Sequence, residues 1–482
     1  MNYIELSVFI VYFLFMLGIG LYFFFKSRNA GEKDYFLGGR NMGAWVSALS
    51  AGASDMSAWV LMGLPASVYA AGIGQTWIAI GLGLGYAASW ILEAPRLRRF
   101  SIAANDSITI PQYLTNRFLS QSKALQILCA VIFLTAYTIY AASSVKACGT
   151  LFHTVMNVDA NLAMYGAAII IVAYTFLGGF SAVCWTDFFQ GLLMLGALLI
   201  APIFALGLVK SGNMAEAASL PQGYFNMVRD WREILSGLGW GLGYFGMPHI
   251  IIRFMSLRSD KELKKSSVIG ISWTVIILIM SVLSGIVGRM FLGDIQDSSV
   301  VFITMVRKIF PALFSGILLS AILSAAMSTA DSQLLASASA FASDVYKPVF
   351  RKNAGDKEML WAGRVVVLII ALVAVFIASS PNSGSIMGLV ENAWGVFGAA
   401  FGPVIMLSLF WKRLNFAGTV SGIAVGAVVD ILWLALCSST GIYEIIPGFL
   451  AGLLCAVIVS LCTAAPSKEV EELFEKASHS RA

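Results

Sequence analysis

An aspartate, Asp55, stands within the apolar stretch of residues 42–70, next to Ala53, Met56 and Ser57. A charge at membrane depth costs about 2.5–3.5 kcal/mol on insertion scales, so this carboxylate needs a partner or a water-lined cavity. The serines and glycines around it favour backbone that leaves the helix and turns its carbonyl groups toward a ligand. We therefore expect a monovalent cation and a solute to bind here. The alternative is a carboxylate that pairs with a lysine or caps a broken helix.

A second set of oxygen donors lies far along the chain, at Ser328 and Thr329, with Ala325 one helical turn earlier. Two hydroxyl oxygens beside a freed carbonyl group suit a hard cation such as Na⁺. Taken alone, such hydroxyls more often bond to the carbonyl group of the preceding turn. Pairing with the helix of Asp55 favours the cation site.

Aromatic residues near the interrupted helices are candidates for the wall of a solute pocket. They are Trp59, Tyr140, Trp240 and Tyr244, with Pro248 shaping a kink. Aromatic side chains in membrane helices also pack or anchor at the interface, so only their closeness to both interruptions favours a pocket.

Three further charged residues stand near predicted helix ends. Asp187 either lines an inner exit route or caps a helix, and Asp331 can face the same route. Arg40 is expected to anchor a helix at the membrane surface, with a gating role as the alternative. Lys146 is expected to snorkel outward from its helix. Glu391 and Asp430 are expected to be polar packing or interfacial residues.

The composition indicates an integral membrane protein. Of 482 residues, 59% are hydrophobic and only 12% are charged, and the mean hydropathy is +0.83. Soluble domains carry about 25% charged residues. The six cysteines and three histidines show no metal-binding spacing and no catalytic triad, so we expect no enzyme, no organic cofactor and no nucleic-acid partner.

Thirteen apolar stretches are long enough to be membrane spans. They are Leu6–Phe25, Met42–Ala70, Ile73–Leu92, Leu125–Thr150, Leu162–Leu177, Phe188–Val209, Ile234–Ile252, Ser267–Val287, Leu313–Ala342, Val365–Ala378, Ile386–Trp411, Phe416–Leu436 and Ile446–Cys462. Most of the 31 Lys and Arg residues, Arg253 among them, fall on one side if the loop after the first span is cytoplasmic. The positive-inside rule then predicts the N-terminus outside and the C-terminus inside.

Spans two to six and seven to eleven form two sets of five, and each set opens on a helix interrupted by glycines. A unit with an odd number of spans reverses its topology when repeated, so we expect inverted repeats. The predicted organisation is an N-terminal helix and loop (1–41), a first repeat (42–210), an extracellular loop (211–233), a second repeat (234–411), two C-terminal helices (412–464) and a charged cytoplasmic tail (465–482), which is expected to be a solvated or surface helix. Asp106, Ser107 and Thr109, which precede Pro111, predict a short capped helix in the loop of residues 100–123.

Several motifs resemble those of the sodium/solute symporters, and within that family those of the bacterial sodium/proline symporters. The motifs are Phe36-Leu-Gly-Gly-Arg, Ser54-Asp-Met-Ser, Gly178-Gly-Phe-Ser-Ala, Trp240-Gly-Leu-Gly-Tyr-Phe-Gly, Pro248-His-Ile-Ile, Met327-Ser-Thr, Asn392-Ala-Trp and Phe397-Gly-Ala-Ala-Phe-Gly-Pro. The chain departs from the proline branch at Ala58, Met247 and Lys146, all near the expected pocket.

The resemblance implies a leucine-transporter-like core of two inverted repeats and specific roles for single residues. Na⁺ would be held by backbone oxygens of Ala53, Met56 and Ala325 and by the hydroxyl groups of Ser328 and Thr329, with Asp55 in support. Arg40 and Asp187 would serve coupling or the inner pathway. Implied substrate contacts are Ser57, Trp59, Tyr140, Trp240, Tyr244 and Pro248.

These observations together predict a Na⁺-coupled importer of a small zwitterion, with L-proline favoured, in the cell membrane. No oligomer is required. Another amino acid, pantothenate or proton coupling is the alternative within transporters, and a channel or a transporter-like sensor is the alternative class.

Overall fold

The computed structural model describes residues 2–26, 32–177, 179–212 and 220–479, and in these the chain is helical, with a single isolated β-bridge between Met42 and Leu257. Gly178, the first residue of one motif noted above, lies outside the described residues. The first third of the chain contains α1 (Tyr3–Lys26), α2 (Glu32–Leu37), η1 (Gly38–Arg40), α3 (Ala44–Asp55), η2 (Ala58–Val60), α4 (Gly63–Ala71), η3 (Ile73–Gln75), α5 (Thr76–Ala88), η4 (Ser89–Glu93), α6 (Ala94–Ala103), α7 (Ile110–Arg117) and α8 (Ala124–Met156).

The remaining elements continue the bundle. They are α9 (Ala160–Leu177), α10 (Phe180–Lys210), α11 (Trp231–Gly239), η5 (Trp240–Phe245), α12 (Pro248–Ser256), α13 (Asp260–Leu292), η6 (Ser298–Val300), α14 (Val301–Ile309), α15 (Ala312–Ser339), η7 (Ala340–Phe350), α16 (Asp356–Ser379), α17 (Ile386–Phe410), α18 (Phe416–Cys437), η8 (Ser438–Thr440), α19 (Ile445–Cys462) and α20 (Lys468–His479).

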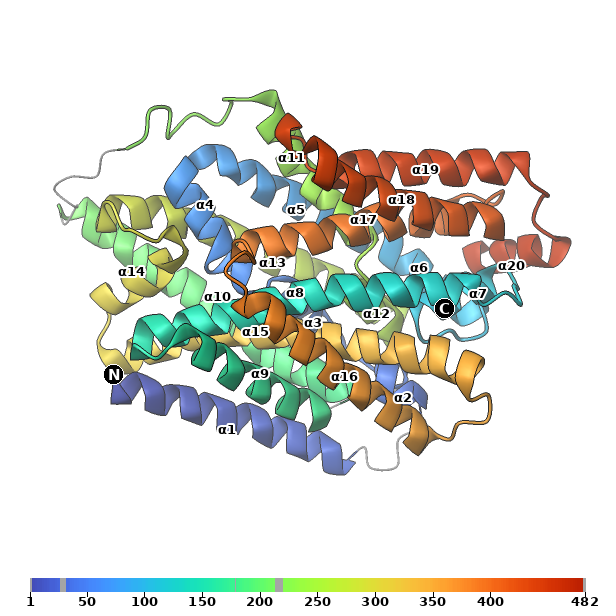
Figure 1. Ribbon diagram of the computed structural model, residues 1–482, viewed down its shortest axis with the longest axis horizontal. Helices are drawn as coiled ribbons and strands as arrows, with labels where there is room; N and C mark the ends of the chain where they lie inside the picture. The colour runs from blue at the N-terminus through green and yellow to red at the C-terminus, as the bar shows by residue number, and fades with distance from the viewer. Residues whose placement is uncertain (1, 27–31, 178, 213–219, 480–482) are drawn as a thin grey trace.

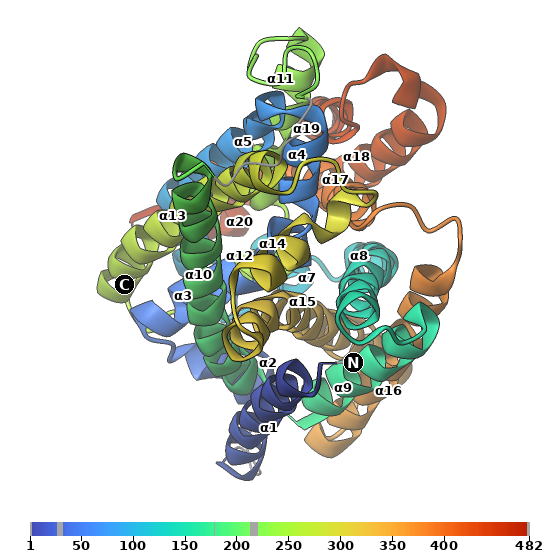
Figure 2. The same cartoon turned by 90° about the vertical axis from the view of Figure 1, so that its left-hand side faces the viewer.

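Ten helices of the described chain are long and apolar enough to cross a membrane. The three other predicted spans correspond to interrupted or shorter helices, namely α3–η2–α4, α9 and α11–η5–α12. The count of thirteen therefore stays a prediction. In Figures 1 and 2, α1 and the α18–α19 pair lie at opposite edges of the bundle, and α15 lies between them.

The first interruption is placed by the residues after Asp55. Met56 leaves helical geometry (ψ 70°) and Ser57 is extended (ψ −172°). The Ser57 N–H donates to the Asp55 carbonyl group at 2.8 Å. The chain then re-enters helix at η2, where Ser57 Oγ accepts from the Trp59 N–H at 3.5 Å. The backbone therefore leaves the regular helical hydrogen-bond pattern beside Asp55, as the small and hydroxylated residues predict.

The second interruption lies between η5 and α12. Met247 is extended, and Pro248 occupies the first turn of α12. Proline has no N–H to leave unpaired there, and it disfavours helical geometry in the residue before it. Glycines of this segment allow close packing: a Cβ at Gly241 would lie 2.4 Å from the Gly81 carbonyl oxygen of α5.

Two helices predicted in segments expected to be cytoplasmic are present in the structure. The Thr109 hydroxyl accepts from the Gln112 N–H at 3.1 Å and caps α7, as the sequence predicts. The tail helix α20 is a surface helix with one face buried: Phe474 packs on Phe100 of α6, with ring centroids 5.3 Å apart.

Candidate functional site

The broken end of α3 meets α15 at the centre of the bundle, through Ser328. The Ser328 hydroxyl donates to the Ala53 carbonyl oxygen at 2.8 Å and also lies 3.2 Å from the Ala325 carbonyl oxygen of its own helix. Thr329, the next residue, is fully buried, and its hydroxyl oxygen has no hydrogen-bond partner. Three predicted cation donors thus meet at one hydroxyl group, and a fourth lies beside them with its oxygen free.

Asp55 lies fully buried at the same helix end. Its Oδ2 accepts a hydrogen bond of 2.6 Å from the Tyr244 hydroxyl, while Oδ1 has no hydrogen-bond partner. Met56, which follows it, is buried and ends α3. Among the residues that the structure describes, no basic side chain pairs with Asp55, and a buried carboxylate in this situation attracts a cation.

The donors near Ser328 and Asp55 are hydroxyl, carbonyl and carboxylate oxygens, with no sulfur or imidazole among them. Oxygen donors of this kind suit a hard cation such as Na⁺ or Ca²⁺ rather than a softer transition metal. The orphaned hydroxyl of Thr329 is the observation that fits such an ion, because a buried polar atom without a partner carries a desolvation cost.

The predicted aromatic residues form one cluster beside Asp55. The rings of Trp59 and Trp240 lie 6.4 Å apart, and the Tyr140 hydroxyl donates to the Asp55 carbonyl oxygen at 3.4 Å. Ser57, also predicted as a substrate contact, is buried, and its hydroxyl oxygen accepts the hydrogen bond from the Trp59 N–H described above. Pro248 is buried at the start of α12, where its role is to set the helix direction.

The prediction missed Trp394 as a member of this cluster. Its indole Nε1 donates to the Trp240 carbonyl oxygen at 2.8 Å, and its ring centroid lies 5.0 Å from that of Tyr244. Trp394 belongs to α17, which brings a third helix to the pocket. The Asn392-Ala-Trp motif was the available signal.

Asp187 does not cap a helix, because α10 begins at Phe180 and Asp187 lies two turns inside it. Its Oδ2 accepts from the Ser50 hydroxyl at 2.6 Å and from Arg253 Nη2 at 3.1 Å. The capping alternative is therefore wrong. Counting Arg253 among the loop charges was also wrong, since it is 1% exposed.

The guanidinium of Arg253 joins four segments. Besides Asp187, it donates to Ser50 Oγ of α3, to the His249 carbonyl oxygen of α12 and to Ser332 Oγ of α15. Asp331, next to Ser332 in the chain, is fully buried. The ion pair of Asp187 and Arg253 therefore joins α10 to α12, and both residues also bond Ser50 of α3.

Arg40 connects the segment before α3 to the loop before α7. Its guanidinium donates to Asp106 Oδ1 at 2.7 Å, to the Ser107 carbonyl oxygen at 2.7 Å and to the Met255 carbonyl oxygen at 2.6 Å. Partial burial alone would raise the pKa of Asp106, but the hydrogen bond from Lys33 and the charge and hydrogen bond of Arg40 outweigh it and lower the pKa. Arg40 is thus a cross-link at the end of α12, which suits the gating alternative better than a simple surface anchor.

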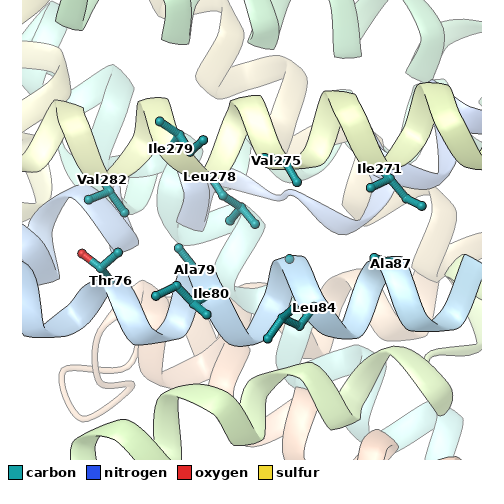
Figure 3. Close-up of a pocket in the computed structure, with 11 residues that line it drawn as sticks. Thr76, Ala79, Ile80, Leu84, Ala87, Ile271, Val275, Leu278, Ile279 and Val282 are labelled. Atoms are coloured by element: carbon teal, nitrogen blue, oxygen red, sulfur yellow. The ribbon is translucent and has the colours of Figure 1, made fainter.

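Two cavities of similar volume, one apolar and one polar, lie among these helices. One, of about 440 Å³ between α5 and α13, is lined by aliphatic side chains with Thr76 as the polar exception (Figure 3). It cannot satisfy a zwitterion or an ion. The other, of about 450 Å³, is polar and reaches Trp240 and Glu391.

The remaining charged predictions have distinct outcomes. Lys146 extends from α8 and donates to Ser383 Oγ at 2.7 Å, in the loop before α17, as expected of a lysine that reaches outward from its helix. Asp430 is fully buried on α18, so it is not an interfacial residue, and Glu391 is half-buried on α17.

Comparison with known proteins agrees with this geometry. Residues 35–426 match the model of the sodium:solute symporter family. The chain is 43% identical to the high-affinity proline transporter PutP of Bacillus subtilis, with 95% of this chain and 98% of that protein covered. It is 40% identical to the sodium/proline symporter of Escherichia coli, with 98% and 96% covered. In fold it is similar to the solved structure of a Na⁺-coupled sialic acid symporter, with a TM-score of 0.80 at 19% identity over 96% of this chain and 99% of that one.

Proposed function

This chain belongs to the sodium:solute symporter family, and we propose that it imports L-proline into the cell together with Na⁺. It is a multi-pass membrane protein and not an enzyme. The observation that carries the proposal is the hydrogen bond of Ser328 to Ala53, which places the oxygen donors of two helices at one point beside Asp55.

In this proposal the Ser328 hydroxyl group keeps its proton but turns it away from the Ala53 carbonyl oxygen, and Na⁺ binds between the two helices. Its ligands are the backbone oxygens of Ala53, Met56 and Ala325 and the hydroxyl oxygens of Ser328 and Thr329. Asp55 supplies negative charge nearby. The orphaned Thr329 oxygen supports this ligand set.

The solute then lies on the other side of the α3 interruption, against aromatic residues. Trp59, Tyr140, Trp240 and Tyr244 surround it, and Ser57 and Pro248 shape its ends. Aromatic faces suit the apolar ring of proline, while freed backbone groups at Ser57 suit its charged ends. Trp394 joins this list as a residue that positions Trp240.

Ion and solute binding are coupled because α3 contributes to both sites. Na⁺ joins α3 to α15 and so fixes the backbone that the solute contacts. Linkage requires that proline raise the affinity for Na⁺ by the same factor by which Na⁺ raises the affinity for proline. Release to the inside then requires the α3–α10–α12 contacts at Asp187 and Arg253, the contacts of Arg40, and the α15 segment at Asp331 to open.

The proposed topology has thirteen spans with the N-terminus outside and the C-terminus inside. The two sets of five, 42–210 and 234–411, rock against one another about the central site. The similarity in fold to the sialic acid symporter supports this arrangement, and so does the distribution of basic residues.

Binding of labelled proline to purified protein tests the function. We expect saturable binding that requires Na⁺, with the affinity for each ligand rising when the other is present. Equal proline affinity in Na⁺-free and Na⁺-containing buffer contradicts the mechanism.

Competition by other amino acids and by pantothenate tests the substrate in the same assay. Uptake into vesicles that follows a pH gradient without Na⁺ would favour proton coupling. A channel or a sensor would show no counterflow of labelled proline, whereas a symporter does.

A further inference from the structure

Three carboxylates, none of them assigned to the proposed Na⁺ or solute site, gather where α17, α18 and α19 meet. Asp430 lies on α18 and is 0% exposed, and Glu444 directly precedes α19 and is 6% exposed. Glu391 lies on α17, and its carbonyl oxygen accepts a hydrogen bond of 2.8 Å from the Tyr443 hydroxyl. Both Asp430 and Glu391 lie close enough to interact electrostatically with Glu444.

The side chains of Asp430 and Glu444 converge on Gly395 of α17. A Cβ at this glycine would lie 2.9 Å from Asp430 Oδ1 and 3.3 Å from Glu444 Cγ. Gly448 of α19 makes room from the other side, since a Cβ there would lie 2.9 Å from the Asp430 Cβ. Because Gly395 and Gly448 have no side chain, the Asp430 carboxylate has space to approach α17.

No positive charge compensates this pair within the described residues. Neither oxygen of Asp430 has a hydrogen-bond partner, and neither has Glu444 Oε1. No ion pair forms between these carboxylates and a lysine or arginine of the described chain. The nearby basic residue is Arg232, which approaches Gly441 and lines the polar cavity with Glu391. Burial without a partner is costly for an ionised carboxylate, and two adjacent ones repel each other.

A polar cavity reaches Glu391, the half-buried member of the cluster. The polar cavity of about 450 Å³ is lined by Glu391 together with Thr440 and Gly441, which lie in the turn between α18 and α19. The charged side chains of its lining are three carboxylates, Asp230, Glu233 and Glu391, and one guanidinium, that of Arg232.

We propose that Asp430 and Glu444 bind a monovalent cation, either Na⁺ or a proton, that joins α18 and α19 to α17. The two share the chemistry that the carboxylates demand, which is one positive charge in a small volume. Glu444 stands at the N-terminus of α19, where the helix dipole offsets part of the cost of its burial, so the cation chiefly compensates Asp430.

The bound cation would influence the solute pocket through α17. Gly395, which the carboxylates face, directly follows Trp394, whose indole holds the Trp240 carbonyl oxygen. A cation between the helices therefore stabilises one position of the residues that position the pocket wall.

Cation binding by the purified full-length protein tests the proposal. Radioactive Na⁺ bound per chain and proton release or uptake on changing from alkaline to mildly acidic buffer are measured for wild type, Asp430→Asn and Glu444→Gln. Glu469→Gln, an exposed carboxylate of α20, is the control for lost charge. Ser328→Ala removes the separate Na⁺ site of the proposed function.

For Na⁺, we expect about one ion fewer per chain in Asp430→Asn, and the same loss on top of Ser328→Ala. If the bound cation is a proton, Asp430→Asn leaves Na⁺ binding unchanged, and the variant takes up about one proton fewer per chain than wild type on acidification. Unchanged Na⁺ binding together with unchanged proton uptake in both Asp430→Asn and Glu444→Gln overturns the proposal.

The variants also separate this site from the proposed function and from misfolding. Failure of Ser328→Ala to reduce Na⁺ binding counts against the proposed Na⁺ site and leaves the Asp430 result to stand on its own. If Asp430→Asn does not fold, Glu444→Gln decides. Gly395→Ala, which keeps both carboxylates but places a methyl group at Oδ1, is expected to weaken binding of the same cation.

Discussion

The Ser328 hydroxyl lies 2.8 Å from the Ala53 carbonyl oxygen, although 275 positions separate the two residues in the chain. This contact joins α15 to the broken end of α3, beside a buried carboxylate that holds a tyrosine hydroxyl. An ion bound by the Ser328 hydroxyl oxygen and the Ala53 carbonyl oxygen would connect the same two helices. In the proposed function this contact marks the Na⁺ site and the point at which Na⁺ binding is coupled to solute binding.

Replacing Ser328 by alanine tests this role. Loss of one Na⁺ ligand and of the α3–α15 contact is expected to weaken apparent Na⁺ affinity by about tenfold or more, which corresponds to about 1.4 kcal/mol. The measurement is the Na⁺ concentration that gives half-maximal proline binding. Ser320→Ala is the matched control, because the Ser320 hydroxyl is buried on α15 and bonds within its own helix, to the Gly316 carbonyl oxygen. An equal loss in both variants would contradict a specific role for Ser328.

Replacing Tyr244 by phenylalanine isolates its hydroxyl from its ring. Asp55 then keeps its charge but loses the hydrogen bond of 2.6 Å, and a buried acceptor left unpaired costs about 1–3 kcal/mol. We expect about a tenfold weaker proline affinity at saturating Na⁺, measured by equilibrium binding. Tyr86→Phe is the control, since the Tyr86 ring packs edge-on against Tyr244 at 5.1 Å and its hydroxyl has no hydrogen-bond partner. Wild-type affinity in Tyr244→Phe would show that the hydroxyl does not support the pocket.

The buried pair of Asp187 and Arg253 predicts strong non-additivity. Asp187→Asn or Arg253→Met alone leaves an unpaired buried charge, which typically costs about 3–5 kcal/mol. The double variant removes both charges, so its thermal stability is expected to exceed that of either single variant. Thermal unfolding in detergent, followed for the four proteins of the cycle, measures this. Additive losses would mean that the two charges act independently.

The ion pair of Asp106 with Arg40 and Lys33 predicts an acid-sensitive contribution to stability. The pKa of Asp106 in the folded state lies below its ordinary value of 3.8. The ion pair therefore stabilises the fold above pH 3.8, and this stabilisation is lost as the pH falls through the lower folded-state pKa. In Asp106→Asn, this part of the acid dependence should disappear. Thermal stability measured against pH provides the comparison, with Glu469→Gln as a control carboxylate on an exposed helix face. Identical acid dependence in wild type and Asp106→Asn would contradict the prediction.

Much of this protein is determined by the types and order of its residues. Apolar stretches of span length predict a helical membrane protein because an isolated backbone in lipid must satisfy its own hydrogen bonds. Glycines, serines and a proline predict the two interruptions because those residues weaken or forbid the regular helix. The motifs around Asp55, Trp240 and Ser328 indicated the family before any contact was known.

The tertiary structure decided which of these residues meet. Arg253 reads as one more basic residue at a helix end, because the positive-inside rule counts charge without burial; only the fold places it against Asp187, 66 positions away. Trp394 likewise meets Trp240, which lies 154 positions away in the chain. The local sequence indicates which interactions a side chain can make. Its actual partners depend on how the helices pack, and its burial then determines the free-energy cost of its charge.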